Sequence, residues 1–158
     1  MIINTDLVLA SSSATFALPE VKRGVVAIAG ALPRLVRTVG KQRAMEMALT
    51  GRVLGAEEAR AWGLVNKVVS DSDSDEEGGG GVVAEAIRWA QEIARNSPDS
   101  VIVSRAGVRM GWEGFGVQEG TERLGRKWWA KMEGGENMVE GVRAFVEKRR
   151  PRWVDSKL

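Results

Sequence analysis

The C-terminal half of the chain carries apolar residues at helical spacing. Over residues 82–94 they recur every three or four positions, as on the buried side of an amphipathic helix. Ser97 and Pro98 form a typical helix start, because serine caps free N–H groups and proline fits the first turn. Similar apolar stripes follow over residues 117–132 and 138–146. The pattern therefore predicts four helices after residue 82, with the second ending near Gly111.

The N-terminal half mixes short strands with short helices. Residues 6–10 and 64–69 are apolar runs of strand length. Helical spacing covers residues 41–50 and 56–62, and a glycine directly follows each stretch, as is common at helix ends. A few strands followed by a helical region predict a fold of the α/β class.

An acidic and glycine-rich segment over residues 70–81 separates these halves. It has no base and no large apolar side chain, so it cannot bury enough surface to offset the entropy cost of ordering. We expect a core region over 1–69, a disordered loop over 70–81 and a helical region over 82–158. The alternating aspartates resemble a calcium loop only in part, because the distal bidentate glutamate is missing. No metal site is expected.

The chain has 158 residues and a formal net charge of +2, but no histidine and no cysteine. The missing histidine excludes Ser-His-Asp and Cys-His catalysis, and the missing cysteine excludes disulfides and thiolate metal sites. Catalysis by this chain must therefore use carboxylates, lysine, arginine, hydroxyls or backbone dipoles. The longest apolar run, residues 25–32, is too short to span a bilayer, and the first residues do not resemble a signal peptide.

The last three residues are Ser156, Lys157 and Leu158. A C-terminal Ser-Lys-Leu is the signal that the peroxisomal import receptor recognises. We therefore expect a peroxisomal protein with that receptor as a partner. The residues just before the tripeptide are expected to leave it exposed.

Several segments together carry a family resemblance. In order along the chain they are Asp6-Leu7-Val8-Leu9-Ala10-Ser11, Phe16-Ala17-Leu18-Pro19-Glu20, Ala44-Met45-Glu46 to Leu49-Thr50-Gly51, Ala56-Glu57-Glu58-Ala59, Gly63-Leu64-Val65-Asn66-Lys67-Val68-Val69, and Ala144-Phe145-Val146-Glu147-Lys148-Arg149. In this order and spacing they resemble the enoyl-CoA hydratase/isomerase family, the crotonase family. The wording of the second segment leans toward its carnitinyl-CoA dehydratase branch.

The resemblance implies the C-terminal part of a crotonase spiral, followed by oligomerisation helices. It implies hydration or isomerisation of enoyl-CoA thioesters in fatty-acid β-oxidation or carnitine-type metabolism. The CoA thioester is then the substrate, and no resident cofactor is expected. Glu20 matches the family glutamate that handles the proton at C2, and so is the expected general acid/base. Ala27 and Ile28 replace a Pro-Gly pair that helps to place water, which weakens the case for hydration relative to isomerisation.

The resemblance also places important parts before residue 1. The family's first glutamate falls immediately ahead of Met1, as do the loop and strand that supply the oxyanion-hole N–H groups. We therefore expect this chain to be an N-terminally truncated member that is inactive alone. A full-length protein is expected to form trimers or hexamers, in which Phe145 and Lys148 match residues that bind the CoA of a neighbouring subunit. The alternative is that Phe145 belongs to the core and Lys148 is only solvated.

Two other classes of function stay open at this point. The chain could be a non-catalytic assembly partner that keeps only the oligomerisation helices. It could also bind RNA, as some relatives do, with Trp128 and Trp129 among basic residues as stacking surfaces. Trp128 lies on an apolar stripe, however, which favours packing, and nothing else indicates nucleic acid as a partner.

Overall fold

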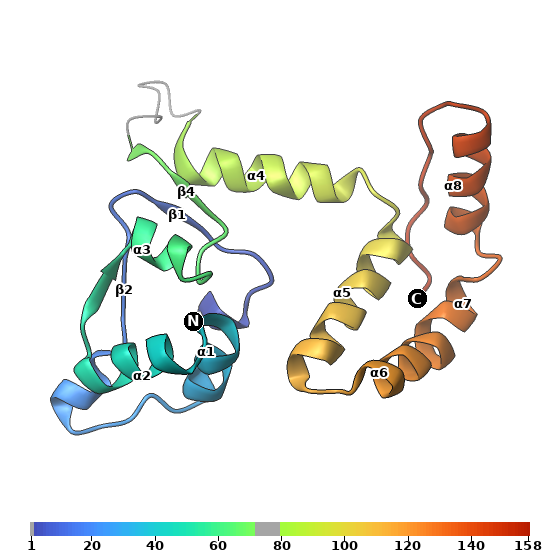
Figure 1. The fold of residues 1–158 in the computed structure, drawn as a ribbon. Coiled ribbons are helices and arrows are strands. Elements are labelled where there is room, and N and C mark those ends of the chain that lie inside the picture. Colours follow the sequence, from blue (N-terminus) through green and yellow to red (C-terminus); the bar gives the residue numbers. More distant parts are fainter. Residues whose placement is uncertain (1, 72–79) are drawn as a thin grey trace. The chain divides into compact units, whose positions relative to one another are not determined.

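The computed structural model describes residues 2–71 and 80–158. Its contacts divide the chain into two compact units, Met1–Arg88 and Trp89–Leu158, each of which is described by itself (Figure 1). Most of the acidic segment, including Asp73, Asp75, Glu76 and Glu77, lies outside the described residues. No helix in the two described stretches combines the length and hydropathy needed to cross a membrane.

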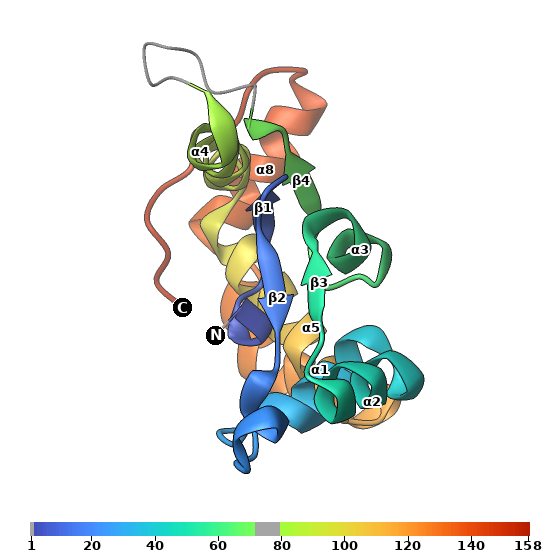
Figure 2. The same cartoon turned by 90° about the vertical axis from the view of Figure 1, so that its left-hand side faces the viewer.

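The first unit contains two pairs of short strands among helices. Its elements are the 3-10 helix η1 (Ile2–Asn4), β1 (Leu9–Ser11), β2 (Thr15–Ala17), the 3-10 helix η2 (Pro19–Arg23), α1 (Ala31–Val39), α2 (Lys41–Thr50), β3 (Val53–Gly55), α3 (Ala56–Ala61) and β4 (Lys67–Val69), and α4 (Gly81–Ala94) starts in it. Strands β1 and β4 are parallel with Ala10 opposite Val68, whereas β2 and β3 are antiparallel with Phe16 opposite Leu54 (Figure 2). This mixture confirms the α/β class.

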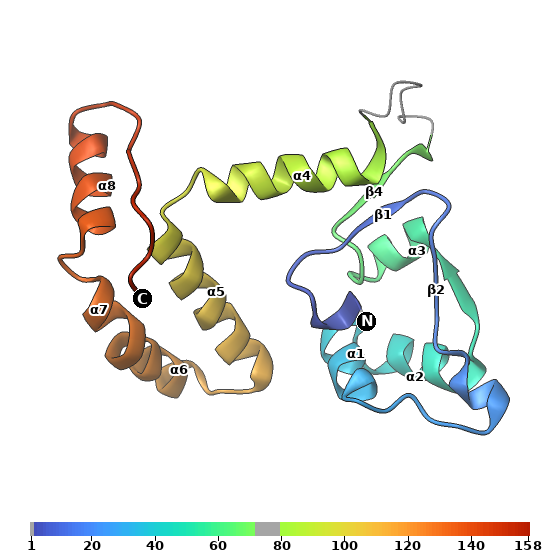
Figure 3. The same cartoon turned by 180° about the vertical axis from the view of Figure 1, so that it is seen from behind.

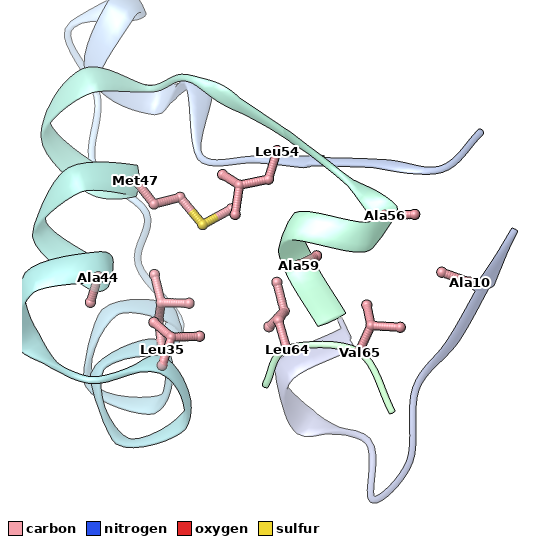
Figure 4. Close-up of a cluster of buried hydrophobic side chains, with 10 residues drawn as sticks. Ala10, Leu35, Ala44, Met47, Leu54, Ala56, Ala59, Leu64 and Val65 are labelled. Atoms are coloured by element: carbon pink, nitrogen blue, oxygen red, sulfur yellow. The ribbon is translucent and has the colours of Figure 1, made fainter. Parts of the chain in front are cut away.

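The core of this unit forms where helical and strand periodicities meet. In α1, Ala31, Leu35 and Val39 are buried at intervals of four residues, which places them on one side of the helix. In β3 only Leu54 points inward, and it is 0% exposed, because neighbouring strand residues face opposite ways. Figure 4 shows the Met47 side chain directed toward Leu54. Buried residues of α1, α2 and β3, among them Leu35, Met47 and Leu54, thus belong to one hydrophobic cluster.

The strands are shorter than the apolar runs predicted. Leu64 and Val65 are buried but precede β4, because Gly63 turns through a φ of 83° and Leu64 N–H closes the end of α3 by donating to Ala59 O at 2.9 Å. Asn66 extends the pairing with β1: its N–H donates to Val8 O, and its Oδ1 accepts from Val8 N–H, both at 2.8 Å. The expected strand over residues 64–69 is thus shortened by the turn at Gly63, and the Asn66 side-chain amide supplies part of its pairing with β1.

Helix α4 has its expected position but not its expected buried side. Val83 and Ile87, in the apolar stripe, are 67% and 53% exposed, whereas Glu85 is 5% exposed. The Glu85 carboxylate pairs with Lys67 at 2.7 Å and with Arg88. This ion-paired cluster, and not the apolar stripe, ties the start of α4 to β4.

The second unit is helical, as predicted. It contains α5 (Pro98–Glu113), α6 (Val117–Leu124), a π-helical turn η4 (Gly125–Trp129), α7 (Ala130–Met132) and α8 (Glu136–Val146). Ser97 caps α5 by accepting a hydrogen bond from Ser100 N–H at 3.4 Å, which confirms that helix start. The helix passes the expected end at Gly111 and stops at Gly114, whose φ is 100°. Beyond α8 the chain turns back along that helix, as Figure 3 shows.

Candidate functional site

Glu20 lies on η2, directly after β2. Pro19 occupies the first helical position, where its missing N–H costs nothing. The Glu20 side chain is half-buried, and its Oε2 is shielded from solvent with no hydrogen-bond partner among the described residues. A shielded acceptor without a donor costs about 1–3 kcal/mol, so such an atom is uncommon unless something else meets it.

The position of Glu20 depends on a close approach between η2 and the end of α2. Gly51 ends α2 with a φ of 57°, in the left-handed region. A Cβ at Gly51 would lie 3.1 Å from Val21 Cγ1 and 3.2 Å from Leu18 O, closer than ordinary contacts. Glycine therefore suits this position, because a side chain would be strained at this φ and would push η2 away from α2.

An apolar cavity of about 210 Å³ opens near this helix. Its lining is almost entirely aliphatic or aromatic and includes Ile3, Phe16, Leu18, Leu35, Met47 and Leu64. Leu18 is two residues before Glu20, but Glu20 is not among the lining residues. The first unit therefore offers an apolar surface beside a carboxylate and not a closed catalytic pocket.

The loop from η2 to α1 is exposed and strained. Val26 and Ile28 are 65% and 77% exposed. Ala29 has a φ of 60°, which is unusual for a residue with a side chain. Arg34 holds the turn by donating from Nη1 to Gly30 O at 3.4 Å. Ile28, which stands where the family often has glycine, thus presents its side chain to solvent immediately before a strained residue.

Phe145 and Lys148 lie in the second unit, at the end of α8. Phe145 is 86% exposed, which excludes the alternative that it belongs to the core of this unit. Lys148 is exposed, with a φ of 53°; its N–H donates to Phe145 O, and Arg149 N–H donates to Ala144 O. This is a Schellman motif with lysine at the position that usually holds glycine.

The basic residues near the C-terminus are less available for a phosphate ligand than their number indicates. Arg149 forms a two-pronged ion pair with Glu140, at 2.6 and 2.8 Å, and Arg143 pairs with Glu147 at 2.9 Å. Lys157 pairs with Glu136. The Arg149 guanidinium lowers the pKa of Glu140 to about 2, helped by the Arg152 N–H. Within the described stretches, Lys148, Arg150 and Arg152 have no such ion pair.

The C-terminal tripeptide is exposed in part. The Lys157 side chain is 79% exposed and forms its ion pair with a residue of α8, whereas Ser156 and Leu158 are half-buried. The residues before it do not hold it away from the unit, because Val154 N–H donates to Asn137 Oδ1 at 2.9 Å. Sequence reasoning missed Asn137, because an amide side chain within a helix gives no signal of a contact 17 residues away.

The described residues hold no metal centre, and the two tryptophans named as possible stacking surfaces differ: Trp129 is 45% exposed, whereas Trp128 is covered in part. The described residues contain no cluster of three or more acidic side chains able to hold a metal ion. Trp128 is half-buried with its Nε1 shielded from solvent, which supports packing for this residue over base stacking. Lys127 Nζ lies 4.9 Å from the centre of the Trp128 ring.

Comparison with known proteins decides the family. The family model for enoyl-CoA hydratase/isomerase matches residues 1–156. The chain belongs to this family. An enoyl-CoA hydratase subunit of Geobacillus kaustophilus has the same fold with a TM-score of 0.85 and 33% identity, over 98% of this chain and 56% of that one. The resemblance recognised in the sequence is thereby confirmed.

The relatives also refine the branch. The mevalonyl-coenzyme A hydratases of Beauveria bassiana and Aspergillus fumigatus are 54% and 51% identical over all 158 residues. The chain covers 54% and 56% of their lengths, so it spans about half of these curated relatives. The carnitinyl-CoA dehydratase of Salmonella typhi is 33% identical over 151 residues. The carnitine branch is thus among the relatives, but a carnitine or fatty-acid specificity is not supported.

Proposed function

We propose that the chain supplies one half of the active site of a CoA-thioester hydratase, with Glu20 as the general acid/base. The observation that carries this proposal is the Glu20 carboxylate, which is held on η2 with one shielded oxygen that lacks a partner among the described residues. Leu18, two residues before Glu20, lines the apolar cavity, which suits an acyl chain better than a polar ligand.

In this role Glu20 moves a proton at C2 of the thioester. In the hydration direction, water adds as hydroxyl at C3 of the enoyl thioester and gives its other proton to a base of the complete site, while Glu20 delivers a proton to C2. In the reverse direction Glu20 takes the C2 proton as the C3 hydroxyl leaves with another proton as water. A positioned carboxylate suits both directions, because it alternates between acid and base within one cycle.

The substrate class proposed for the complete site is a branched 3-hydroxyacyl-CoA of the mevalonyl type. Support comes from the two relatives named mevalonyl-coenzyme A hydratase, which match the whole chain at 54% and 51% identity. The mevalonyl group carries a hydroxyl and a methyl at C3. Loss of this tertiary hydroxyl with a C2 proton gives a conjugated thioester, so the reaction can be followed by absorbance.

The test uses the chain alone and a chimera that restores the segment of the Beauveria bassiana relative that the chain does not match. With mevalonyl-CoA, the 158-residue chain is expected to show no turnover, and the chimera is expected to be active. In the chimera, Glu20→Gln should lower kcat by about 10²–10⁴-fold, the usual contribution of a general acid/base. The absorbance of the conjugated thioester provides the measurement.

The matched control is Glu57→Gln, which removes an exposed carboxylate from a surface ion pair with Arg60 and should leave kcat unchanged. Retention of activity in the Glu20→Gln chimera would remove Glu20 from its assigned role. Substantial turnover by the chain alone would show that the added segment is not needed. An active chimera that prefers straight-chain enoyl-CoA would contradict the proposed substrate class only.

We also propose that the exposed apolar side of α8 packs against a neighbouring subunit in the complete protein. Val139, Val142, Phe145 and Val146 are 56%, 60%, 86% and 73% exposed along this helix. Contiguous apolar surface of this kind marks interaction sites in soluble proteins. In a trimer or hexamer this side would bring Phe145 and Lys148 to the CoA of a neighbouring subunit.

For the cell, we propose a peroxisomal location set by Ser156-Lys157-Leu158. An N-terminally tagged chain ending at Leu158 should enter peroxisomes, and removal of these three residues should leave it outside them. Fluorescence microscopy with a peroxisomal marker provides the measurement. Import of the shortened chain would show that the signal lies elsewhere.

A further inference from the structure

The segment before the C-terminal tripeptide is fixed to its own unit by hydrogen bonds. Asn137 is 3% exposed and contacts Val154 in both directions: Nδ2 donates to Val154 O at 3.0 Å, and Oδ1 accepts from Val154 N–H at 2.9 Å. Asn137 Nδ2 also donates to Asp99 Oδ2 at 2.9 Å. An amide that pairs with the backbone in this way holds an extended segment in one register.

Two contacts upstream hold the same segment. Trp153 Nε1 donates to Arg95 O at 2.8 Å, and its ring lies so near Gly141 that a Cβ there would be 3.2 Å from it. The Arg152 N–H donates to Glu140 Oε1 at 2.7 Å. Arg152, Trp153 and Val154 are therefore fixed in succession, and the tripeptide starts from a restrained position.

The tripeptide itself meets an acidic corner. Lys157 pairs with Glu136 in the first turn of α8, and this carboxylate raises the pKa of the lysine, with a smaller contribution from Asp99. Asp99 is 8% exposed, and its Oδ1 has no hydrogen-bond partner among the described residues. Both carboxylates, with Asn137, Lys157 and Leu158, line a cavity of about 310 Å³. Two acids thus lie near a cationic side chain that is itself 79% exposed.

We propose that Asp99, Glu136 and Asn137 form a C-terminal clasp that competes with the peroxisomal import receptor for Ser156-Lys157-Leu158. This inference rests on the peroxisomal signal proposed above. Lys157 and Glu136 are 79% and 63% exposed, so their ion pair lies at the surface and restrains the tail without burying it. It is the half-buried Leu158, at the end of a restrained segment, that the receptor reaches only when the clasp opens. The receptor binds only the open form, so its apparent Kd rises as the fraction of chains with an open clasp falls.

The experiment titrates the tripeptide-binding domain of the import receptor with four ligands. They are a synthetic peptide of residues 150–158, the chain ending at Leu158, and its Glu136→Gln and Asn137→Ala variants. The chain should bind about tenfold more weakly than the peptide, as expected when the open clasp is a minor state. Glu136→Gln should recover about 2–5-fold, the scale of an exposed ion pair, and Asn137→Ala should recover about tenfold.

Glu133→Gln is the matched control, because it makes the same change at an exposed position three residues before Glu136 and should leave affinity unchanged. Circular dichroism checks the fold of Asn137→Ala. If Asn137→Ala unfolds, Glu136→Gln still tests the clasp, because Glu136 is exposed. Equal affinity of chain and peptide would overturn the clasp and leave the signal standing. A peptide that does not bind would overturn the signal and, with it, the competition proposed here.

Discussion

At the scale of single residues, Lys148 combines an unfavourable backbone with an exposed charge. A left-handed conformation costs a residue with a Cβ about 1–2 kcal/mol, whereas glycine adopts it freely but gains about 0.5–1 kcal/mol of backbone freedom when unfolded. A lysine at φ 53° in a Schellman motif therefore reduces stability where glycine would serve. The charge is the property that glycine could not supply.

Substitution of Lys148 separates these two effects. Lys148→Gly should raise the free energy of unfolding by about 0.5–1 kcal/mol, because the strain that it relieves exceeds the added freedom of the unfolded chain. In the active chimera the same change should raise KM for the CoA thioester about tenfold, through loss of one charge-assisted contact to phosphate. Denaturant titration and steady-state kinetics measure the two quantities.

Lys148→Asn provides the comparison, since asparagine tolerates the left-handed region and also lacks the charge. It should share the rise in KM. An unchanged KM in both variants would mean that Lys148 is only solvated, the alternative left open by the sequence.

At the scale of an element, one of the contacts that hold the returning chain along α8 depends on the ionised form of Glu140. Its pKa is lowered from an ordinary 4.5 to about 2, first by the hydrogen bonds from Arg149 and then by the Arg152 N–H. A carboxyl whose pKa is lower in the folded state stabilises that state above its ordinary pKa and loses the effect as the pH falls toward the lowered one. The contact between Glu140 and the Arg152 N–H should therefore weaken between about pH 4.5 and pH 2.

Amide exchange of Arg152, followed by NMR, measures this change. Protection of the Arg152 N–H should be complete at neutral pH and lost across the acid range. In Glu140→Gln that protection should be weaker at neutral pH and nearly independent of pH, because the titrating group is gone. Protection that persists at pH 2 in the unaltered chain would exclude Glu140 as the controlling group.

At the scale of the whole molecule, local patterns predicted what local interactions determine. The start of α5 at Ser97 and the helix over Lys41–Thr50 follow from capping and periodicity, which act within a few residues. Glu20 could be selected only through the family resemblance, because nothing in its neighbours distinguishes it from other acids. The contact of Asn137 with Val154 joins residues 17 positions apart, and the buried side of α4 depends on Lys67 of β4. Neither of these long-range contacts produces a periodic pattern in the sequence.

The sheet pairings have a further consequence for how the isolated chain behaves at high concentration. Within the described stretches each strand pairs with one other strand, so each has one edge without a strand partner. Open edges are templates for pairing with a second chain, and lysine on an edge opposes this.

Light scattering should therefore show reversible clustering that rises with concentration. Thr15→Lys on β2 should suppress this clustering, whereas Thr121→Lys on α6 should not. Equal scattering from both variants would assign any clustering to other surfaces. If Thr15→Lys alone suppresses the clustering, the colloidal stability of the isolated chain is set by the four three-residue strands of the described stretches and not by the helices.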